Sequence, residues 1–167
     1  MNAEGGHLAD VLERIGRNVL GELEDLPDEV KNRAVPICEA NTLFAFATHP
    51  GGAGEFWVLV LAGGREADRD RDAEFRASGT NVELAKRYNV WIGAIREVLS
   101  KSRADAVERP AEPPLEFRGS LGDQPMTVRA CVLHTVEHSA LHLGQIQLTR
   151  SQLTEPRREL LAEFDQR

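Results

Sequence analysis

Three histidines recur at intervals of four residues in the last third of the sequence: His134, His138 and His142. In an α-helix each residue turns by about 100°, so a step of four moves the side chain by only about 40°. The three imidazoles therefore form one stripe if this segment is helical. Two histidines at positions i and i+4 can bind one metal ion from a single helix. The spacing indicates a metal site whose further ligand comes from another part of the chain.

The residues around this stripe are polar along the same line and mostly apolar elsewhere. The line also carries Thr127, Cys131, Gln145 and Thr149, whereas the flanks and back carry Val132, Val136, Leu141, Leu143, Ile146 and Leu148. A polar line on an otherwise apolar helix is expected inside a helical bundle, where buried polar groups need partners. A metal ion, water or the neighbouring imidazoles can each satisfy them.

Two further histidines are candidates for the missing ligand. His49 lies within an apolar segment and is expected to face inward, whereas His7 is close to the N-terminus and is expected at the surface. Glu137 projects about 100° away from His138, so we expect it at the surface or in a helix contact rather than as a general base. The only Glu-x-x-His spacing is Glu4 to His7, which argues against a di-iron carboxylate bundle.

The elements that must position these residues are predicted to be helices. Apolar residues with a helical period predict four long helices and one short C-terminal helix, over residues 7–26, 39–61, 80–100, 127–152 and 156–164. Thr80 and Thr127 are candidate N-caps. The fold class is therefore all-α, a four-helix bundle, with one domain over residues 1–167.

The second of these helices has an unusual interior. His49 is followed by Pro50, Gly51 and Gly52. Proline removes a backbone donor and crowds the preceding turn, so the sequence predicts two helical pieces, over 39–48 and 53–61, with a kink or break between them. Gly63 and Gly64 are expected to end the second piece.

Two long connections join the later helices. Nine of the twelve residues from Arg65 to Arg76 are charged, with alternating sign; this pattern favours a solvated loop with a helical turn, long enough to cross the length of a bundle. Residues 101–125 contain four prolines. Within them, residues 115–118 alternate between apolar and charged and predict a short extended piece. A loop of this length is expected to cover a functional region.

Composition bounds the classes of function. The 167 residues carry a formal net charge of −7, which argues against nucleic acid as the main partner. No apolar run approaches the roughly 18 residues of a membrane span. The N-terminal residues lack the basic and apolar regions of a signal peptide, so we expect a cytoplasmic protein in which Cys38 and Cys131 are reduced thiols.

The motifs together resemble a known family. They are His49 with an aromatic residue two turns later, Trp57, and the late-helix pattern His138-x-x-x-His142-x-Gly144-Gln145. This combination resembles the DinB-like metalloenzyme superfamily over residues 7–153. The resemblance implies a bundle with a long connection between its second and third helices. It also implies a divalent metal, commonly zinc or nickel, bound by residues corresponding to His49, His138 and His142. This chain departs from the family in having Leu143 where a basic residue is frequent, and Pro50 directly after His49.

The remaining pocket assignments follow from position. His134 corresponds to a frequent additional histidine of the family and is expected to line the pocket or support a ligand. Asn41, two turns before His49, is expected to line the pocket, as is Gln145, and Tyr88 and Trp91 are expected to form its wall. No catalytic group is indicated beyond water or a thiolate bound to the metal.

Three hypotheses of function stay open, and the first of them is what the resemblance implies. Characterised members of the family use low-molecular-weight thiols such as mycothiol or bacillithiol, so the leading hypothesis is a thiol-dependent transferase or isomerase acting on a small-molecule substrate; a hydrolase is a variant of it. The second is a metal-binding or stress-associated bundle without turnover. The third is a structural dimeric bundle without metal. A homodimer is favoured because the apolar surfaces of Val132, Val136, Leu143 and residues 56–61 are suited to bury a partner.

Overall fold

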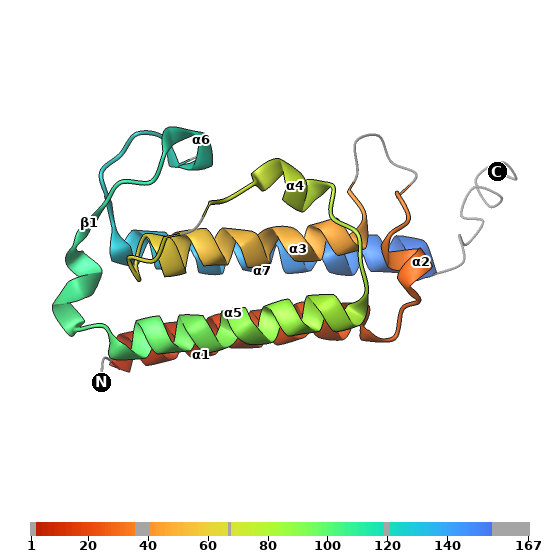
Figure 1. Cartoon of the computed structure of the whole chain (residues 1–167), viewed down its shortest axis with the longest axis horizontal. Helices are drawn as coiled ribbons and strands as arrows, with labels where there is room; N and C mark the ends of the chain where they lie inside the picture. The colour runs from red at the N-terminus through yellow and green to blue at the C-terminus, as the bar shows by residue number, and fades with distance from the viewer. Residues whose placement is uncertain (1–2, 36–40, 67, 119–120, 155–167) are drawn as a thin grey trace, which may run out of the picture.

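Four long helices make up the structure, a computed structural model that describes residues 3–35, 41–66, 68–118 and 121–154. They are α1 (Ala3–Glu24), α3 (Leu43–Gly54) with its π-helical continuation η1 (Glu55–Val60), α5 (Asn81–Lys101) and α7 (Val128–Thr154) (Figure 1). The predicted all-α fold class is confirmed. The short helix predicted over residues 156–164 lies outside the described residues.

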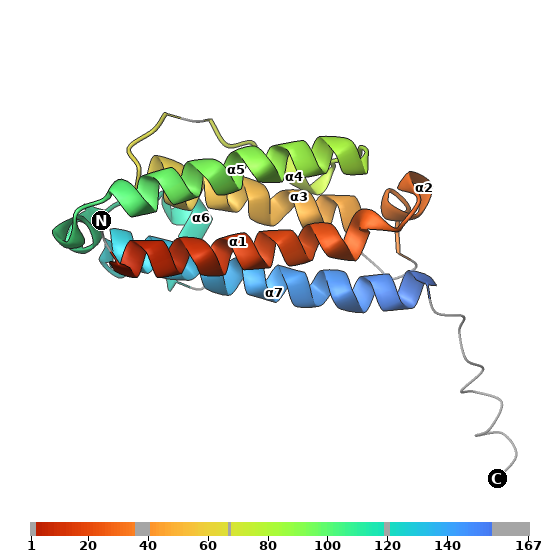
Figure 2. The same ribbon diagram turned by 90° about the horizontal axis from the view of Figure 1, so that it is seen from below.

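The order of the helices in the bundle explains the longest connection. α1 packs mainly against α5 and α7, and α3 packs against α7 and α5. α1 and α7 run in one direction and α3 and α5 in the other (Figures 1 and 2). The chain must therefore travel the length of the bundle between the end of η1 and the start of α5, as the sequence predicts.

Short elements occupy the connections. They are α2 (Asp28–Lys31), α4 (Arg71–Phe75), the 3₁₀ helix η2 (Ala104–Glu108), α6 (Leu115–Arg118) and the strands β1 (Pro110–Ala111) and β2 (Met126–Thr127), which pair antiparallel. The extended piece predicted over residues 115–118 is wrong, because these residues form α6. Pro113 and Pro114 directly precede it, and the fixed φ of proline suits the start of a helix.

The helix that carries His49 does not break at Pro50. α3 runs through the proline and ends at Gly54, so the prediction of two pieces separated by a kink is wrong. Pro50 still lacks its backbone donor, but nearly every residue of α3 is buried. Burial of a whole helix against its neighbours outweighs the unfavourable propensity of one residue. Beyond Gly54 the helix widens into η1, in which the Leu61 amide donates to the Phe56 carbonyl oxygen at 3.1 Å.

The glycines after Pro50 make room for other side chains. A Cβ atom on Gly52 would lie 2.1 Å from Oε1 of Glu74, and one on Gly54 would lie 2.3 Å from the indole of Trp91. These are far below any ordinary contact distance. The glycine run that suggested a break thus allows the charged connection and α5 to approach the α3 backbone closely.

The predicted helix ends are confirmed where they are described. Thr80 and Glu83 form a reciprocal capping box at the start of α5, and the Thr127 hydroxyl accepts from the Ala130 amide at 3.3 Å at the start of α7. Gly64 adopts a positive φ of 68° just after η1, which few other residues tolerate. These local signals fix where the long helices start and stop.

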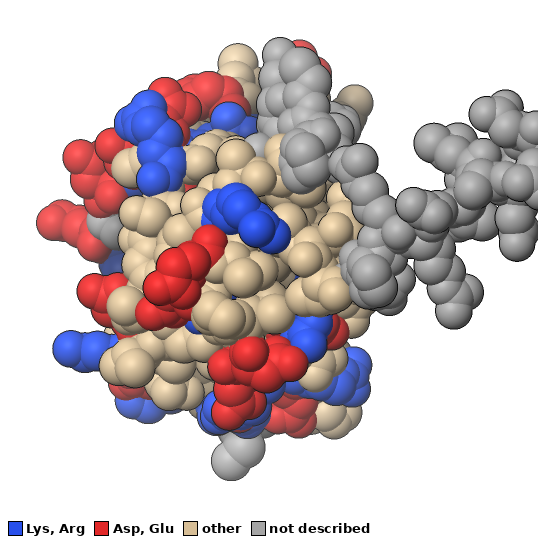
Figure 3. All heavy atoms as spheres, turned by 90° about the vertical axis from the view of Figure 1, so that its right-hand side faces the viewer, with Lys and Arg blue, Asp and Glu red and all other residues tan. Residues whose placement is uncertain are grey.

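Charged side chains of both signs alternate over the surface. On the end of the bundle shown in Figure 3, acidic and basic groups gather around the edge, and groups of both signs also lie on the mostly uncharged central area. Along the helices, exposed arginines are paired with carboxylates, for example Arg96 with Asp10 at 2.7 Å and Arg17 with Glu13 at 3.0 Å. Among the described residues, no helix is both long enough and apolar enough to cross a membrane.

Most of the apolar surface that was expected to bury a partner is used inside the bundle. Val132 and residues 56–59 are buried, and Val136 and Leu143 pack against the core. On α7 the exposed apolar side chains are instead Leu133, Leu141 and Leu148. Cys131 is a buried free thiol whose pKa burial raises to about 11, and Cys38 lies outside the described residues.

Candidate metal centre

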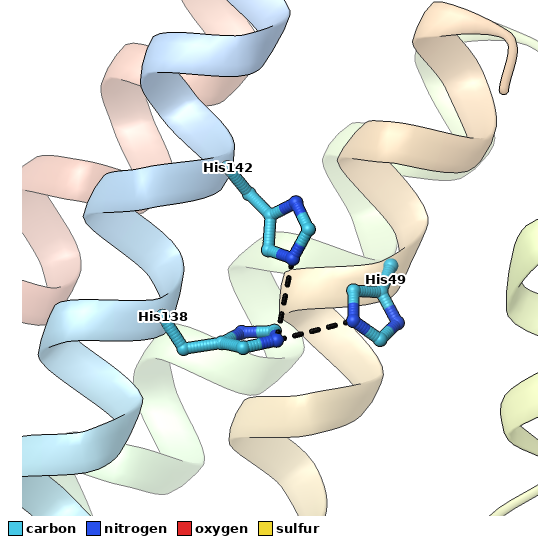
Figure 4. A group of neighbouring side chains, drawn as sticks. All are labelled: His49, His138 and His142. Carbon is cyan, nitrogen blue, oxygen red and sulfur yellow. Dashed lines mark hydrogen bonds between the residues drawn. The ribbon is translucent and has the colours of Figure 1, made fainter. Parts of the chain in front are cut away.

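Three imidazoles converge between α3 and α7. His138 and His142 project from successive turns of α7, and His49 projects from α3 toward them (Figure 4). The Nε2 atom of His138 lies 3.1 Å from Nε2 of His49 and 3.2 Å from Nε2 of His142. One ligating nitrogen from each ring lies within 4.8 Å of the others. The structure thus brings together the three residues that the sequence proposes as ligands.

Burial keeps the two α7 imidazoles neutral. It lowers the pKa of His138 to about 3, with a further contribution from the facing imidazoles, chiefly His142. It also lowers the pKa of His142 to about 4, with His49 contributing next. Both rings therefore carry a lone pair at neutral pH, which is the protonation state that a metal ion requires.

Hydrogen bonding among the three rings cannot satisfy them all. The Nε2 atom of His138 faces two other Nε2 atoms, and it carries at most one proton to donate. Buried Nδ1 atoms of His138 and His142 have no partner among the described residues. A cation placed between the Nε2 atoms would satisfy all three lone pairs. Two imidazole ligands at about 2.05 Å from a tetrahedral ion are separated by about 3.3 Å, close to the distances found. The donor set therefore fits a metal ion.

A buried carboxylate supports His49 from the side opposite the cluster. Oε2 of Glu74 lies 2.7 Å from Nδ1 of His49, and both Glu74 oxygens accept from the Arg69 guanidinium at 2.9 Å. Burial alone would raise the pKa of Glu74, but the hydrogen bonds from His49 and Arg69 outweigh it and lower the pKa. Because an ionised carboxylate can only accept, the proton in this contact is on Nδ1 of His49.

Neither Glu74 nor Arg69 was singled out by the sequence analysis. Both lie in the connection of residues 65–76, which was predicted to be solvated. The predicted helical turn is present as α4, but the side chains of Glu74 and Arg69 are only 6% and 7% exposed. In the sequence these two residues look like the seven other charged residues of the same run, so the pattern does not indicate which charges are buried. The only available signal was Phe75, an apolar residue that interrupts the charged run.

Aromatic rings enclose the cluster. The His49 ring stacks on Phe75 at a centroid distance of 4.3 Å. Phe46 approaches His142 at 6.4 Å. His134 lies one turn before the ligand candidates, 5.6 Å from the His138 ring, and packs edge-to-face on Trp57 at 4.5 Å. His134 is therefore beside the cluster but outside its convergent nitrogens.

Comparison with known families agrees with this arrangement. A family model described as the DinB superfamily matches residues 11–146, which includes all three histidines and the connection that carries Glu74. The chain belongs to the DinB superfamily. No curated protein sequence matches the chain. The three-histidine cluster of this DinB superfamily member is compatible with a bound metal ion.

Two of the predicted pocket residues belong to different parts of the fold. Gln145 lies on α7, three residues beyond His142. Its Oε1 atom is buried without a hydrogen-bond partner among the described residues, and Gln145 partly offsets the lowered pKa of His142. Asn41 is half-buried just before the N-cap of α3. Asn41 thus lies outside the helix that carries His49, and its role as a pocket residue stays a prediction.

Tyr88 and Trp91 lie in the core of this DinB superfamily member. The Tyr88 hydroxyl donates to the Ala47 carbonyl oxygen at 2.6 Å, and Trp91 packs over Gly54. Burial raises the pKa of Tyr88 far above its ordinary value. Among the described residues, no ring contact joins either side chain to the three histidines. They hold α5 against α3, while His7 and Glu137 are exposed, as predicted.

Proposed function

We propose that this protein is a metal-dependent enzyme whose His49, His138 and His142 hold one divalent ion. The observation that carries the proposal is the convergence of three imidazoles, the buried His49 and the half-buried His138 and His142, whose hydrogen-bonding capacity the described residues do not satisfy. Three protein ligands are typical of catalytic zinc sites, in which a further position is open, whereas structural sites use four. Zinc and nickel are the ions proposed, because imidazole suits both.

The chain supplies binding and orientation in this proposal. When bound, the ion would supply Lewis acidity, which lowers the pKa of a coordinated thiol or water. Glu74 accepts a hydrogen bond from the Nδ1–H group of His49, which directs the Nε2 lone pair into the site. Phe75 and Phe46 shield the imidazoles from water. His134, beside Trp57, is positioned to contact a substrate at the other end of the cluster.

A low-molecular-weight thiol is the proposed cosubstrate, and a small electrophile is the proposed substrate. Family membership supports this choice. In the transfer, the thiol loses its proton to solvent, its sulfur bonds to the electrophilic carbon, and the leaving group departs with its electron pair. We further propose a homodimeric, cytoplasmic protein.

Metal content is the decisive measurement. Untagged protein purified without chelator, or incubated with zinc or nickel salts, is expected to hold stoichiometric metal. H138A and H142A are expected to lose it, because each removes one of the ligands. H134A is the matched control: it removes a histidine of the same helix and stripe that lies outside the convergent nitrogens, so its metal content should equal that of the wild type.

Three outcomes separate the proposed functions. Metal together with a rate that saturates with added thiol supports the enzyme. Metal without any thiol-stimulated rate would indicate a metal-binding or stress-associated protein instead. Wild-type protein that takes up no metal, with H138A as stable as the wild type, would contradict the proposal and leave a structural bundle.

A further inference from the structure

The residues that support His49 come from outside the long helices. Arg69 and Glu74 belong to the connection between η1 and α5, and Figure 1 shows this segment and α4 lying along α3. Both oxygens of Glu74 are occupied by Arg69, and Oε2 also contacts His49 at 2.7 Å. Burying both partners of a salt bridge costs desolvation free energy. That cost is offset only when the geometry of the pair is good and its remaining donors and acceptors form hydrogen bonds. The two hydrogen bonds from Arg69 give good geometry, and the contact with His49 provides Oε2 of Glu74 with a further partner.

Residues from several elements surround the Arg69–Glu74 pair. The guanidinium carbon of Arg69 lies 5.2 Å from the centre of the Phe117 ring and 5.9 Å from that of Phe56, so two aromatic faces hold it. The Glu74 carboxylate fills the space that a side chain at residue 52 would occupy, 2.1 Å from the position of a Cβ atom on Gly52. The α3 backbone is therefore shaped to admit Glu74.

The three imidazoles are supported unequally. The Nδ1–H group of His49 donates a hydrogen bond to the ionised carboxylate of Glu74, whereas the Nδ1 atoms of His138 and His142 have no hydrogen-bond partner among the described residues. A hydrogen bond to one ring nitrogen fixes which nitrogen of an imidazole is free to bind metal, and also fixes the ring plane. In this cluster, Glu74 of the connection between η1 and α5 fixes the tautomer and the ring plane of His49 in this way.

We propose that Glu74, anchored by Arg69, is a positioning residue that sets the tautomer and orientation of His49 for metal binding. The proposal rests on the proposed metal-binding role of the three histidines. The proposal also implies a coupling in both directions. If docking of residues 69–75 increases the affinity for metal by some factor, then bound metal must favour that docking by the same factor. Docking of residues 69–75 on α3 raises metal affinity, and bound metal holds residues 69–75 in place.

Metal affinity of matched variants tests the positioning role. Zinc or cobalt affinity is measured by competition with a chromophoric chelator for the wild type, E74A, E74Q and H138A. E74A should weaken binding about tenfold to a hundredfold, the usual cost of losing such a partner. E74Q should fall between E74A and the wild type, because its amide oxygen can still accept from His49 without the charge.

Two adjacent glycines provide a control that leaves Glu74 in the chain. In G52A the new methyl group must displace the carboxylate, and a cavity of about 270 Å³ beside it gives the side chain somewhere to go. In G51A the methyl group meets Tyr88 at 3.6 Å, an ordinary contact. Both G51A and G52A replace a glycine of α3 by alanine, so both gain the same helix propensity. G52A should therefore weaken metal binding as E74A does, and G51A should leave it unchanged.

Hydrogen exchange tests the reciprocal coupling. Backbone amides of residues 69–77 should exchange more slowly in the zinc-loaded wild type than in the metal-free protein, and this difference should shrink in E74A. Amides of α5 serve as the reference that metal should not affect. The visible spectrum of the cobalt-loaded protein should also change in E74A and G52A, because a reoriented His49 alters the ligand geometry.

Failure of this proposal differs from failure of the metal site. Wild-type protein that binds no metal contradicts the proposed function itself. Wild-type protein that binds metal, loses it in H138A, and binds equally well in E74A, E74Q and G52A overturns the positioning role alone. Circular dichroism of each metal-free variant establishes whether it is folded. If E74A does not fold, the metal affinity of E74Q is compared with that of the wild type instead.

Discussion

The two helices that carry the histidines are built in opposite ways. α3 is enclosed: nearly all its residues are buried, and the space above Gly52 and Gly54 is filled by side chains from other elements. α7 is half open: Leu141 and Leu148 are 61% and 69% exposed, and nothing lies within 4 Å of a Cβ atom on Gly144. The cluster thus joins a helix fixed by its surroundings to one that has room around it.

This difference extends to the imidazoles themselves. His49 on α3 has a charged partner in Glu74, whereas the buried Nδ1 atoms of His138 and His142 on α7 have no partner in the part of the chain that the structure describes. In the proposed metal site, His49 would therefore be the ligand whose orientation is fixed by a hydrogen bond, whereas no described side chain fixes His138 or His142 through its Nδ1 atom.

Lowering the pH should have the largest effect on stability, because, among the described residues, His138 and His142 lack the charged partner that His49 has. The pKa values of His138 and His142 are lowered in the folded protein, to about 3 and about 4, from about 6.5 in an unfolded chain. Acid therefore protonates the unfolded chain first. In chelator-treated protein, the stabilising effect of these neutral imidazoles should be complete above pH 6.5 and lost progressively toward pH 3.

Urea denaturation at pH 7, 5.5 and 4.5 measures this effect. The double variant H138N/H142N is the control, because it retains Glu74 and all other carboxylates. Its stability should fall less between pH 7 and pH 4.5 than that of the wild type. Parallel pH profiles for the two proteins would show that the α7 imidazoles do not carry the effect.

A methyl group on α3 should be poorly tolerated. In G54A the new Cβ atom would lie 2.3 Å from the indole of Trp91, which is buried and has little room to move. Overpacking of this kind costs typically about 1–3 kcal/mol. The midpoint of urea denaturation should fall accordingly; a variant as stable as the wild type would mean that α5 can shift away from α3.

The same methyl group on α7 should be stabilising. A Cβ atom on Gly144 meets nothing within 4 Å, and alanine is favoured over glycine in a helix by about 0.5–1 kcal/mol. G144A should therefore raise the denaturation midpoint slightly. Opposite signs for G54A and G144A would confirm the contrast between the helices, and a loss of stability in G144A would contradict it.

The sequence predicts what depends on local pattern. Helical periodicity, the capping residues Thr80 and Thr127, and the length of the 65–76 connection are all present as expected, because each rests on interactions between residues close in the chain. The stripe of His134, His138 and His142 is of the same kind. Family membership of the chain, expected from the residues around His49 and His142, is confirmed.

What the sequence does not predict depends on contacts between distant segments. Pro50 and its glycines suggest a break, and only the burial of α3 by several neighbours explains why the helix continues. Glu74 is one acidic residue in a charged run, and its contact with His49 spans 25 residues. The path of the connection over α3 decides which of its charges becomes buried, and no local periodicity encodes that path.

One consequence of the aromatic packing is optical. The chain has two tryptophans; Trp91 is enclosed in the core above Gly54, whereas Trp57 touches His134 at the edge of the cluster, with ring centroids 4.5 Å apart. Indole emission is sensitive to neighbouring charge and to nearby paramagnetic ions. Trp57 is therefore a fluorophore beside the proposed centre, so that occupancy can be followed by intrinsic fluorescence without any label.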